Sequence, residues 1–292
     1  MVNVELLVYA VLNGFSIGMT LIVPALGLQL IFGLMHVANF AHGNFFALGA
    51  YIAFSVVLVT GNFWLAIPIS ALIVAGLGAI IEPTILRRIY DRPVAHSLIV
   101  MYGVLLLTYD LIEVTWGSVG IPFSGPPELA RSLWLGIVEY PAYRIFQILA
   151  SGAAAFFLWL FLKRTELGLL IRAGVQNRDM VQALGVNIKR IFLLSFCIAV
   201  GIAGIAGVLA APLMQLFPFM GNDIIIKIFI IVVLGGIGSF RGAIVAGLTL
   251  GLSSAFAALV WPPLSEIIMY LLMGSIIIIR PGGILGEGEV FG

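Results

Sequence analysis

The densest group of polar side chains in an apolar setting lies within residues 32–51, which read FGLMHVANFAHGNFFALGAY. Its polar members are His36, Asn39, His42 and Asn44. Gly33 and Gly43 permit a break in a helix, where exposed backbone groups can meet a polar or zwitterionic solute. Polar groups at membrane depth are costly, so they usually face protein or water. We therefore predict a substrate pathway lined by Asn39, His42, Gly43 and Asn44. A short solvated turn between two spans is the alternative.

Other kinds of chemistry find little support. His36 and His42 fall on different faces of a helix that turns about 100° per residue, and no carboxylate or cysteine lies near them, so we expect no metal site. Neither histidine has a nucleophile beside it, and we expect no catalytic residue. The phosphate-binding pattern G-x-x-x-x-G-K-[ST] does not occur, so ATP hydrolysis would require another polypeptide. We expect no cofactor on this chain, and no basic run resembles a nucleic-acid patch.

The elements that must position these residues are apolar and long. Hydrophobic residues make up 62% of the 292 residues and charged residues only 9%, with a mean hydropathy of +1.20. Soluble domains carry roughly 25% charged residues, so this chain is predicted to be an all-α integral membrane protein with about 8–10 transmembrane helices. The predicted spans lie near 7–33, 44–60, 63–86, 96–116, 143–162, 191–213, 223–239, 243–260 and 264–280.

The distribution of basic residues predicts the orientation of these spans. If the spans alternate, eleven of the fourteen lysines and arginines fall on one side of the membrane. The positive-inside rule makes that side cytoplasmic, with the N-terminus outside and the C-terminus in the cytoplasm. Segment 117–142, rich in glycine and proline, becomes an extracytoplasmic loop. A missed or re-entrant segment within 34–46 would change this parity.

The largest predicted cytoplasmic loop runs from Lys163 to Arg190. We expect a short helix over roughly 178–184, ended by Gly185, and we expect Asn187 to cap the next span. An amphipathic pattern is expected, with an apolar side made by Met180, Val181 and Leu184 and polar residues at Asn177, Arg178 and Gln182. An interfacial helix and a plain linker are both open interpretations. The more specific one is a helix that docks onto a cytoplasmic partner.

Four motifs in colinear order resemble one known family. They are Asn39-Phe40-Ala41-His42-Gly43, the loop residues Thr165, Gly168, Arg172-Ala173 and Gly185-Val186-Asn187, the turn Gly235-Gly236-Ile237-Gly238-Ser239, and the C-terminal Arg280-Pro281-Gly282-Gly283-Ile284-Leu285-Gly286. The chain resembles the LivH-type permease subunit of branched-chain (hydrophobic) amino acid ABC transporters, a family with urea- and amide-transporting relatives. It departs from that family at Asn44, where an acidic residue is usual.

This resemblance implies a single transmembrane permease domain over 1–292 in the bacterial inner membrane, and an ATP-driven importer. Segment 172–187 would be the coupling helix, bounded by Gly174 and Gly185. Its candidate contacts with the ATPase are Arg172, Gly174, Asn177, Arg178, Asp179, Gln182 and Gly185. The implied partners are a second, LivM-like permease, two ATP-binding subunits that carry ATP and magnesium, and a periplasmic or surface solute-binding protein.

Two further interpretations compete with this one. Urea or a short amide is the alternative solute, and an ion-coupled secondary carrier is the alternative class, although the centres of the spans hold few charges. Asp110 and Glu113 lie three residues apart and could attract a substrate ammonium group, or could be solvated carboxylates at the headgroup boundary. Glu82 is expected to pair with nearby arginines.

Overall fold

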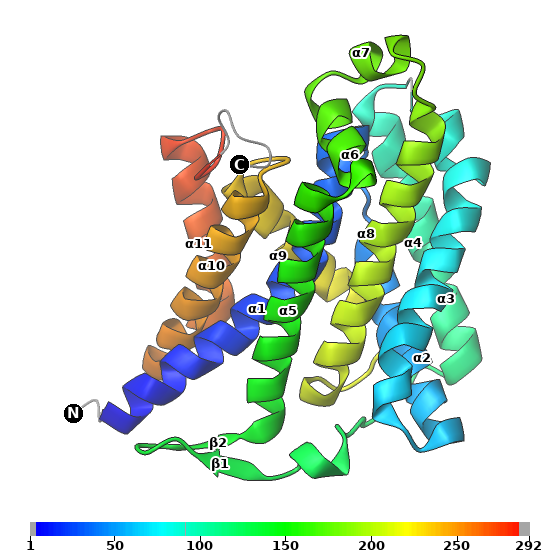
Figure 1. Cartoon of the computed structure of the whole chain (residues 1–292). Coiled ribbons are helices and arrows are strands. Elements are labelled where there is room, and N and C mark those ends of the chain that lie inside the picture. The colour runs from blue at the N-terminus through cyan, green and yellow to red at the C-terminus, as the bar shows by residue number, and fades with distance from the viewer. Residues whose placement is uncertain (1–3, 91, 286–292) are drawn as a thin grey trace.

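The computed structural model describes residues 4–90 and 92–285 and is built almost entirely of helices (Figure 1). The long helices are α1 (Val4–Met35), α2 (His42–Thr60), α3 (Phe63–Thr84), α4 (Val94–Trp116), α5 (Ala142–Arg164), α8 (Ile188–Ala210), α9 (Met220–Gly235), α10 (Phe240–Val260) and α11 (Leu264–Ile279). The short elements are the 3₁₀ turns η1 (Leu86–Arg88), η2 (Pro127–Leu129) and η3 (Ala211–Leu213), the strands β1 (Ser132–Trp134) and β2 (Glu139–Pro141), and the helices α6 (Glu166–Gln176) and α7 (Arg178–Ala183).

The long helices match the apolar runs of the sequence. By length and composition, seven helices within the described ranges could cross a membrane, and α11 is a shorter apolar helix. This confirms the predicted all-α membrane class. Helix α9 has 16 residues and therefore spans about 24 Å, less than the ~30 Å of a hydrocarbon core. Helix α9 starts three residues before the predicted span 223–239 and ends four residues before its end. It ends there because the backbone turns at Gly236, where φ is +94°.

Local signals fix where the helices start and end. Gly61 adopts a φ of +67° and ends α2, and the Asn62 side chain accepts a hydrogen bond from the backbone N–H of Trp64 at 2.9 Å, which starts α3. The predicted cap at Asn187 is confirmed, because its Oδ1 accepts from the Arg190 N–H at 3.3 Å.

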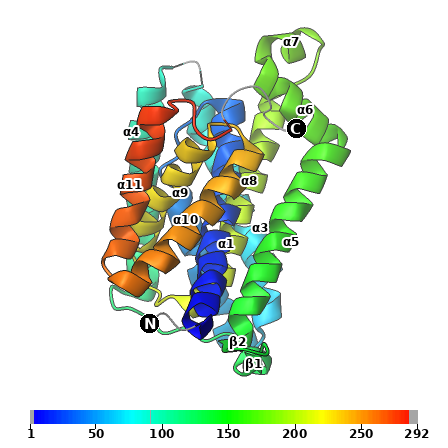
Figure 2. The same cartoon turned by 90° about the vertical axis from the view of Figure 1, so that its left-hand side faces the viewer.

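The connections gather at two opposite ends of the bundle. Helices α6 and α7 and the last turn of α11 lie at one end, and the first turn of α1 and the β1–β2 hairpin lie at the other (Figures 1 and 2). The hairpin is antiparallel, with Leu133 opposite Tyr140, and occupies part of the predicted outer loop 117–142. The two ends therefore separate the basic loop 163–190 from loop 117–142, as alternating spans require.

Helix α1 lies at the centre of the bundle, where it packs against α5, α8, α9 and α10. Small residues allow the closest approaches. A side chain at Gly14 would collide with the backbone of Leu252, and one at Gly18 with the backbone of Gly247. Because lipid offers no hydrophobic drive for helix association, close packing at glycines is what holds such helices together.

Candidate functional site

The break between α1 and α2 places the polar cluster inside the protein. Helix α1 ends at Met35, and His36 adopts a φ of +53°, a left-handed conformation that is uncommon for a residue with a side chain. The chain then runs without helical structure to His42, where α2 begins. In this segment the backbone N–H of Ala38 donates to the Ser97 hydroxyl at 3.3 Å. Such non-helical backbone is tolerated at membrane depth only where protein or a cavity surrounds it.

His42 is fully buried and joins α2 to α1. Its Nε2 lies 2.9 Å from the carbonyl oxygen of Pro24, so Nε2 carries the hydrogen and donates it. The ring lies beside Gly27, where a side chain would meet both the imidazole and the backbone of Ala199. With Nε2 as the donor, Nδ1 is left as an acceptor, and it has no partner among the described residues.

Asn44 joins α2 to α4 and lies against the start of α9. Its Nδ2 donates to the Leu105 carbonyl at 2.6 Å and to the Thr108 hydroxyl at 3.0 Å. Its Oδ1 has no hydrogen-bond partner within the described part of the chain. Gly43 and Gly221 allow the two helices to touch, since a side chain on either would collide with the backbone of the other.

Unpaired polar atoms mark this cluster. Asn39, His42 and Asn44 are 0% exposed, and both amide atoms of Asn39 lack partners in the described ranges. Buried polar side-chain atoms are paired in the large majority of cases, so such a concentration calls for a ligand or water. The structure thus brings the four predicted pathway residues together in the interior and excludes the solvated turn. Their role in transport stays a prediction.

A second buried polar group, missed by the sequence analysis, holds the glycine-rich turn. Gln29 of α1 accepts from the backbone N–H of Gly238 at 2.5 Å and donates to the carbonyl of Gly236 at 2.9 Å. Gln29 is the one amide within the apolar run 21–35 of α1. A single amide in such a run is the sequence signal that could have indicated a buried polar contact. It fixes the connection between α9 and α10.

The loop 163–190 holds two helices rather than one. Helix α6 begins at Glu166 with Thr165 as its cap, ends at Gln176, and is followed by an extended residue, Asn177, which caps α7. The prediction of one coupling helix over 172–187 is therefore wrong, because Asn177, at φ −157° and ψ 95°, interrupts it. Gly185, at φ +82°, ends the segment as predicted.

Gly174 was predicted to bound the coupling segment and instead lies inside α6. It is buried, and a side chain there would meet Leu34 near the end of α1. Helix α6 thus packs directly on the last turn of α1, beside the break that carries Asn39.

The remaining predicted contact residues differ in exposure. Arg172 and Arg178 are half-buried, and the others are exposed: Asn177, Asp179, Gln182 and Gly185. On α7, Val181 packs inward, whereas Met180 and Leu184 are 58% and 75% exposed. The amphipathic prediction for this helix is therefore only partly right. The tip of α7 presents a mixed polar and apolar surface.

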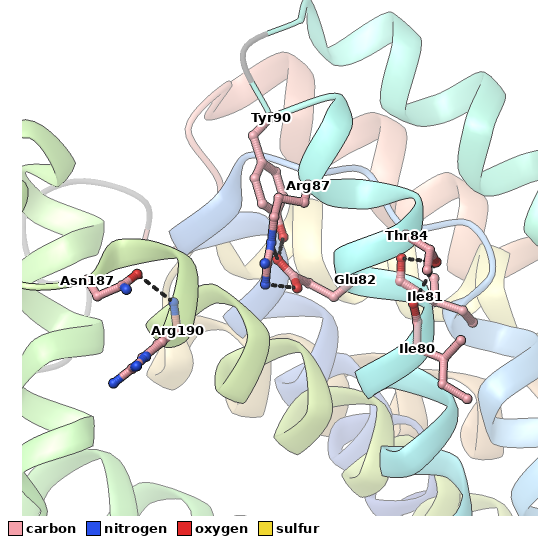
Figure 3. Close-up of polar contacts among 8 residues, drawn as sticks. All are labelled: Ile80, Ile81, Glu82, Thr84, Arg87, Tyr90, Asn187 and Arg190. Atoms are coloured by element: carbon pink, nitrogen blue, oxygen red, sulfur yellow. Dashed lines mark hydrogen bonds and ion pairs between the residues drawn. The ribbon is translucent and has the colours of Figure 1, made fainter.

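An ion pair with a buried carboxylate lies at the end of α3 (Figure 3). Glu82 is 0% exposed and accepts hydrogen bonds from Arg87 Nη2 at 2.7 Å and from the Tyr90 hydroxyl at 2.8 Å. This confirms the predicted local ion pair. Burial and the hydrogen bond to Glu82 raise the pKa of Tyr90 well above its usual range, so Tyr90 stays a donor.

No group of three or more His, Cys, Asp or Glu that could hold a metal occurs in residues 4–90 and 92–285. Asp110 is exposed and Glu113 half-buried on the last turns of α4, separate from the cluster at the start of α2. Gly286 of the C-terminal motif lies outside the described residues.

Comparison with known proteins places this geometry in a family. Residues 10–278 match the family model described as the branched-chain amino acid transport system / permease component. The chain is 30% identical to the high-affinity branched-chain amino acid transport system permease protein LivH of Salmonella typhimurium and to BraD of Pseudomonas aeruginosa, with 95% of each chain covered in both cases. It is 28% identical to the permease protein LivM of Escherichia coli, over 92% of this chain and 68% of that one.

Among solved structures, PsaBC from Streptococcus pneumoniae in complex with Fab superposes with a TM-score of 0.50 at 12% identity, covering 95% of this chain and 93% of that one. At this identity the likeness concerns the fold alone. The family match extends over nearly all of the described helices, including the break at α2 and the α6–α7 pair. The chain therefore belongs to the branched-chain amino acid transport permease family, and it is a multi-span membrane permease.

Proposed function

We propose that this chain is the transmembrane permease subunit of an ATP-driven ABC importer for branched-chain and other hydrophobic amino acids. Relatives at 30% identity carry names that specify branched-chain amino acid transport. A solute of this kind needs an apolar wall and a few polar groups, and the break at α2 offers both.

The observation that carries the proposal is the α6–α7 pair. It lies at the basic end of the bundle and presents Asn177, Asp179 and Gln182 to solvent. A channel that works alone has no need of two short capped helices outside the bundle, whereas a permease driven by a separate ATPase needs such an element for docking. ATP and magnesium would then belong to two ATP-binding subunits.

The coupling would run through α1. Gly174 of α6 lies against Leu34, one residue before the end of α1, and the next segment carries Asn39. A movement of α6 by the ATPase would therefore shift the end of α1 and the break beside it. In this mechanism the break alternates between access from outside and access from inside.

The remaining partners follow from the same proposal. Relatives of both the LivH and the LivM type favour a pair of similar permeases. A periplasmic or surface solute-binding protein would dock at the opposite end, over loop 117–142. Since eleven basic residues lie at the α6–α7 end or in the loops beside it, that end is the cytoplasmic side of an inner membrane, with the N-terminus outside.

The test is uptake in proteoliposomes that contain this permease with its partner permease, ATPases and binding protein. Leucine should accumulate only when ATP is supplied on the cytoplasmic face of the complex. An excess of urea should not reduce leucine uptake. Accumulation by this chain alone under an ion gradient would support a secondary carrier instead. Uptake of urea or a short amide in preference to leucine would replace the solute and keep the class.

A further inference from the structure

A cavity between α1, α5, α9 and α11 contains chemistry that the proposed function leaves unused. Its volume is about 220 Å³. Ligand pockets for drug-sized molecules occupy ~300–1,000 Å³, so this cavity suits a smaller molecule. Its lining includes Arg144 from the first turn of α5, and α5 begins at the end of the bundle that carries the β1–β2 hairpin (Figures 1 and 2).

Two cations line this cavity. Lys227 comes from the middle of α9, is half-buried, and has no hydrogen bond or ion pair to any described residue. Arg144 comes from the first turn of α5, and Asn13 Oδ1 accepts from its Nη1 at 2.5 Å. No acidic side chain lines the cavity. A cation inside an apolar helix of a membrane bundle is costly, which makes a site for an anionic group the default hypothesis for Lys227.

Two hydroxyl oxygens face the same cavity. Ser16 donates its hydrogen to Gln147 Oε1 at 2.9 Å, and Thr20 donates its hydrogen to the Ser16 carbonyl at 2.9 Å. Gln147 Nε2 donates to the Thr20 hydroxyl at 3.0 Å and so fixes its position. Both hydroxyl hydrogens are therefore used, and each oxygen offers the cavity a lone pair that can accept from an ammonium group.

The rest of the lining is apolar and includes Ile17, Leu21, Ile224 and Met269. We propose that this cavity binds the transported amino acid during its passage. Lys227 and Arg144 would hold the carboxylate, Ser16 and Thr20 would accept from the ammonium group, and the apolar residues would receive the side chain. This inference rests on the proposed function, because it takes the solute to be a zwitterionic amino acid.

The cavity and the cluster at the start of α2 lie on different faces of α9. Gly221 and Ile225 of α9 face Gly43, whereas Ile224 and Lys227 face the cavity. The first turns of α9 thus separate two polar regions. A shift of α9 relative to α1 and α2 would change both together.

The first experiment measures leucine uptake by the complete reconstituted complex with Lys227→Gln and Lys227→Arg. In Lys227→Gln, loss of a charge-assisted contact should lower kcat/KM for leucine uptake by about 10- to 100-fold. Lys227→Arg should keep most of the leucine uptake. Removing a half-buried cation from a span favours insertion, so loss of folding is not the expected result. Arg88→Gln, which removes an exposed cation of η1 outside the cavity, is the matched control.

The second experiment asks what the cavity binds. In a Cys197→Ser background, Ile17→Cys places a thiol in the lining, and its labelling rate is measured with leucine or with 3-methylbutylamine, which lacks the carboxylate. Leucine should protect the thiol, the amine should not, and Lys227→Gln should abolish the protection. Wild-type uptake by Lys227→Gln, or equal protection by both compounds, would overturn the proposal.

A lipid phosphate could present the same anionic chemistry, and vesicle composition separates the two sources. Protection by phosphatidylglycerol vesicles over phosphatidylcholine vesicles, with none by leucine, would assign the cavity to lipid and overturn the proposal. If the unmodified complex fails to transport leucine, the proposed solute is wrong whatever the variants do.

Discussion

The guanidinium carbon of Arg178 in α7 lies 5.1 Å from the centre of the Phe192 ring in α8. Tyr90 packs edge-on against the same ring, with the centroids 4.9 Å apart, and its hydroxyl donates to Glu82 at 2.8 Å. A continuous set of contacts therefore leads from α7 to the end of α3. Helix α7 is attached to the bundle through this set as well as through α6.

Reversing the charge of α7 should release the ATPase. We expect Arg178→Glu with Gln182→Glu to reduce copurified ATPase by about tenfold or more, because like charges placed in an interface cost several kcal/mol. The measurement is pull-down from detergent followed by uptake. Arg131→Glu with Ser132→Glu, which adds acidic residues at the opposite end, should leave the ATPase bound. Unchanged assembly and uptake in the α7 variant would contradict the docking assignment.

The Glu82–Arg87 pair should respond unequally to loss of either partner. Arg87→Met leaves a buried carboxylate and should cost about 1–3 kcal/mol, below the ~3–5 kcal/mol of a wholly buried pair, because the Arg87 side chain is 33% exposed. Glu82→Gln should cost less, since the guanidinium can reach water. Thermal unfolding in detergent gives the order, and the double variant should resemble Glu82→Gln. A larger loss from Glu82→Gln would show that the order is wrong.

Removing the unpaired polar groups should impair transport without impairing insertion. Asn39→Leu deletes two polar atoms that lack partners, whereas His42→Leu deletes the unpaired Nδ1 and one hydrogen bond, from Nε2 to the Pro24 carbonyl. The folded protein therefore loses at most one side-chain hydrogen bond in either variant. Leucine uptake should fall by about tenfold or more while the amount of protein in the membrane stays normal. Ser195→Ala removes another buried, unpaired hydroxyl, on α8 and outside residues 39–44, and serves as the control. Full transport by both leucine variants would remove Asn39 and His42 from the pathway.

Close packing of α2 on α9 should make Gly43 intolerant of a methyl group. Gly43→Ala would push against the Gly221 carbonyl and should cost about 1–3 kcal/mol. Gly76→Ala in α3, where no atom lies within 4 Å of the added group, should instead be neutral or gain about 0.5–1 kcal/mol. Thermal unfolding of the two variants side by side checks this. Equal stability would mean that the two helices separate more easily than the structure indicates.

The sequence predicted the membrane class, most spans and the polar break, because hydropathy and glycine breaks are local signals. It did not predict α6, although Thr165 and Glu166 form a helix start there. The reason is that α6 depends on packing against Leu34 of α1, a contact between distant segments. An apolar run also does not indicate which residues of other helices its own residues will contact.

The polar residues inside the spans show the same limit. Gln29, Gln147 and Lys227 are single polar residues in apolar runs, and the sequence places no two of them together. Their partners come from other helices: Gln29 bonds to the turn after α9, and Gln147 to α1. Asn39, His42 and Asn44 were found because they are neighbours in the chain.

The pairing of α2 with α9 also constrains how the protein is made. Helix α2 leaves the ribosome well before Gly221, the residue against which Gly43 comes to rest. Until α9 is synthesised, the polar groups at the start of α2 are not fully enclosed by protein, and exposing them to lipid is energetically costly. The α1–α2 helix pair therefore has to be shielded from lipid by the insertion machinery or by water until α9 has been synthesised.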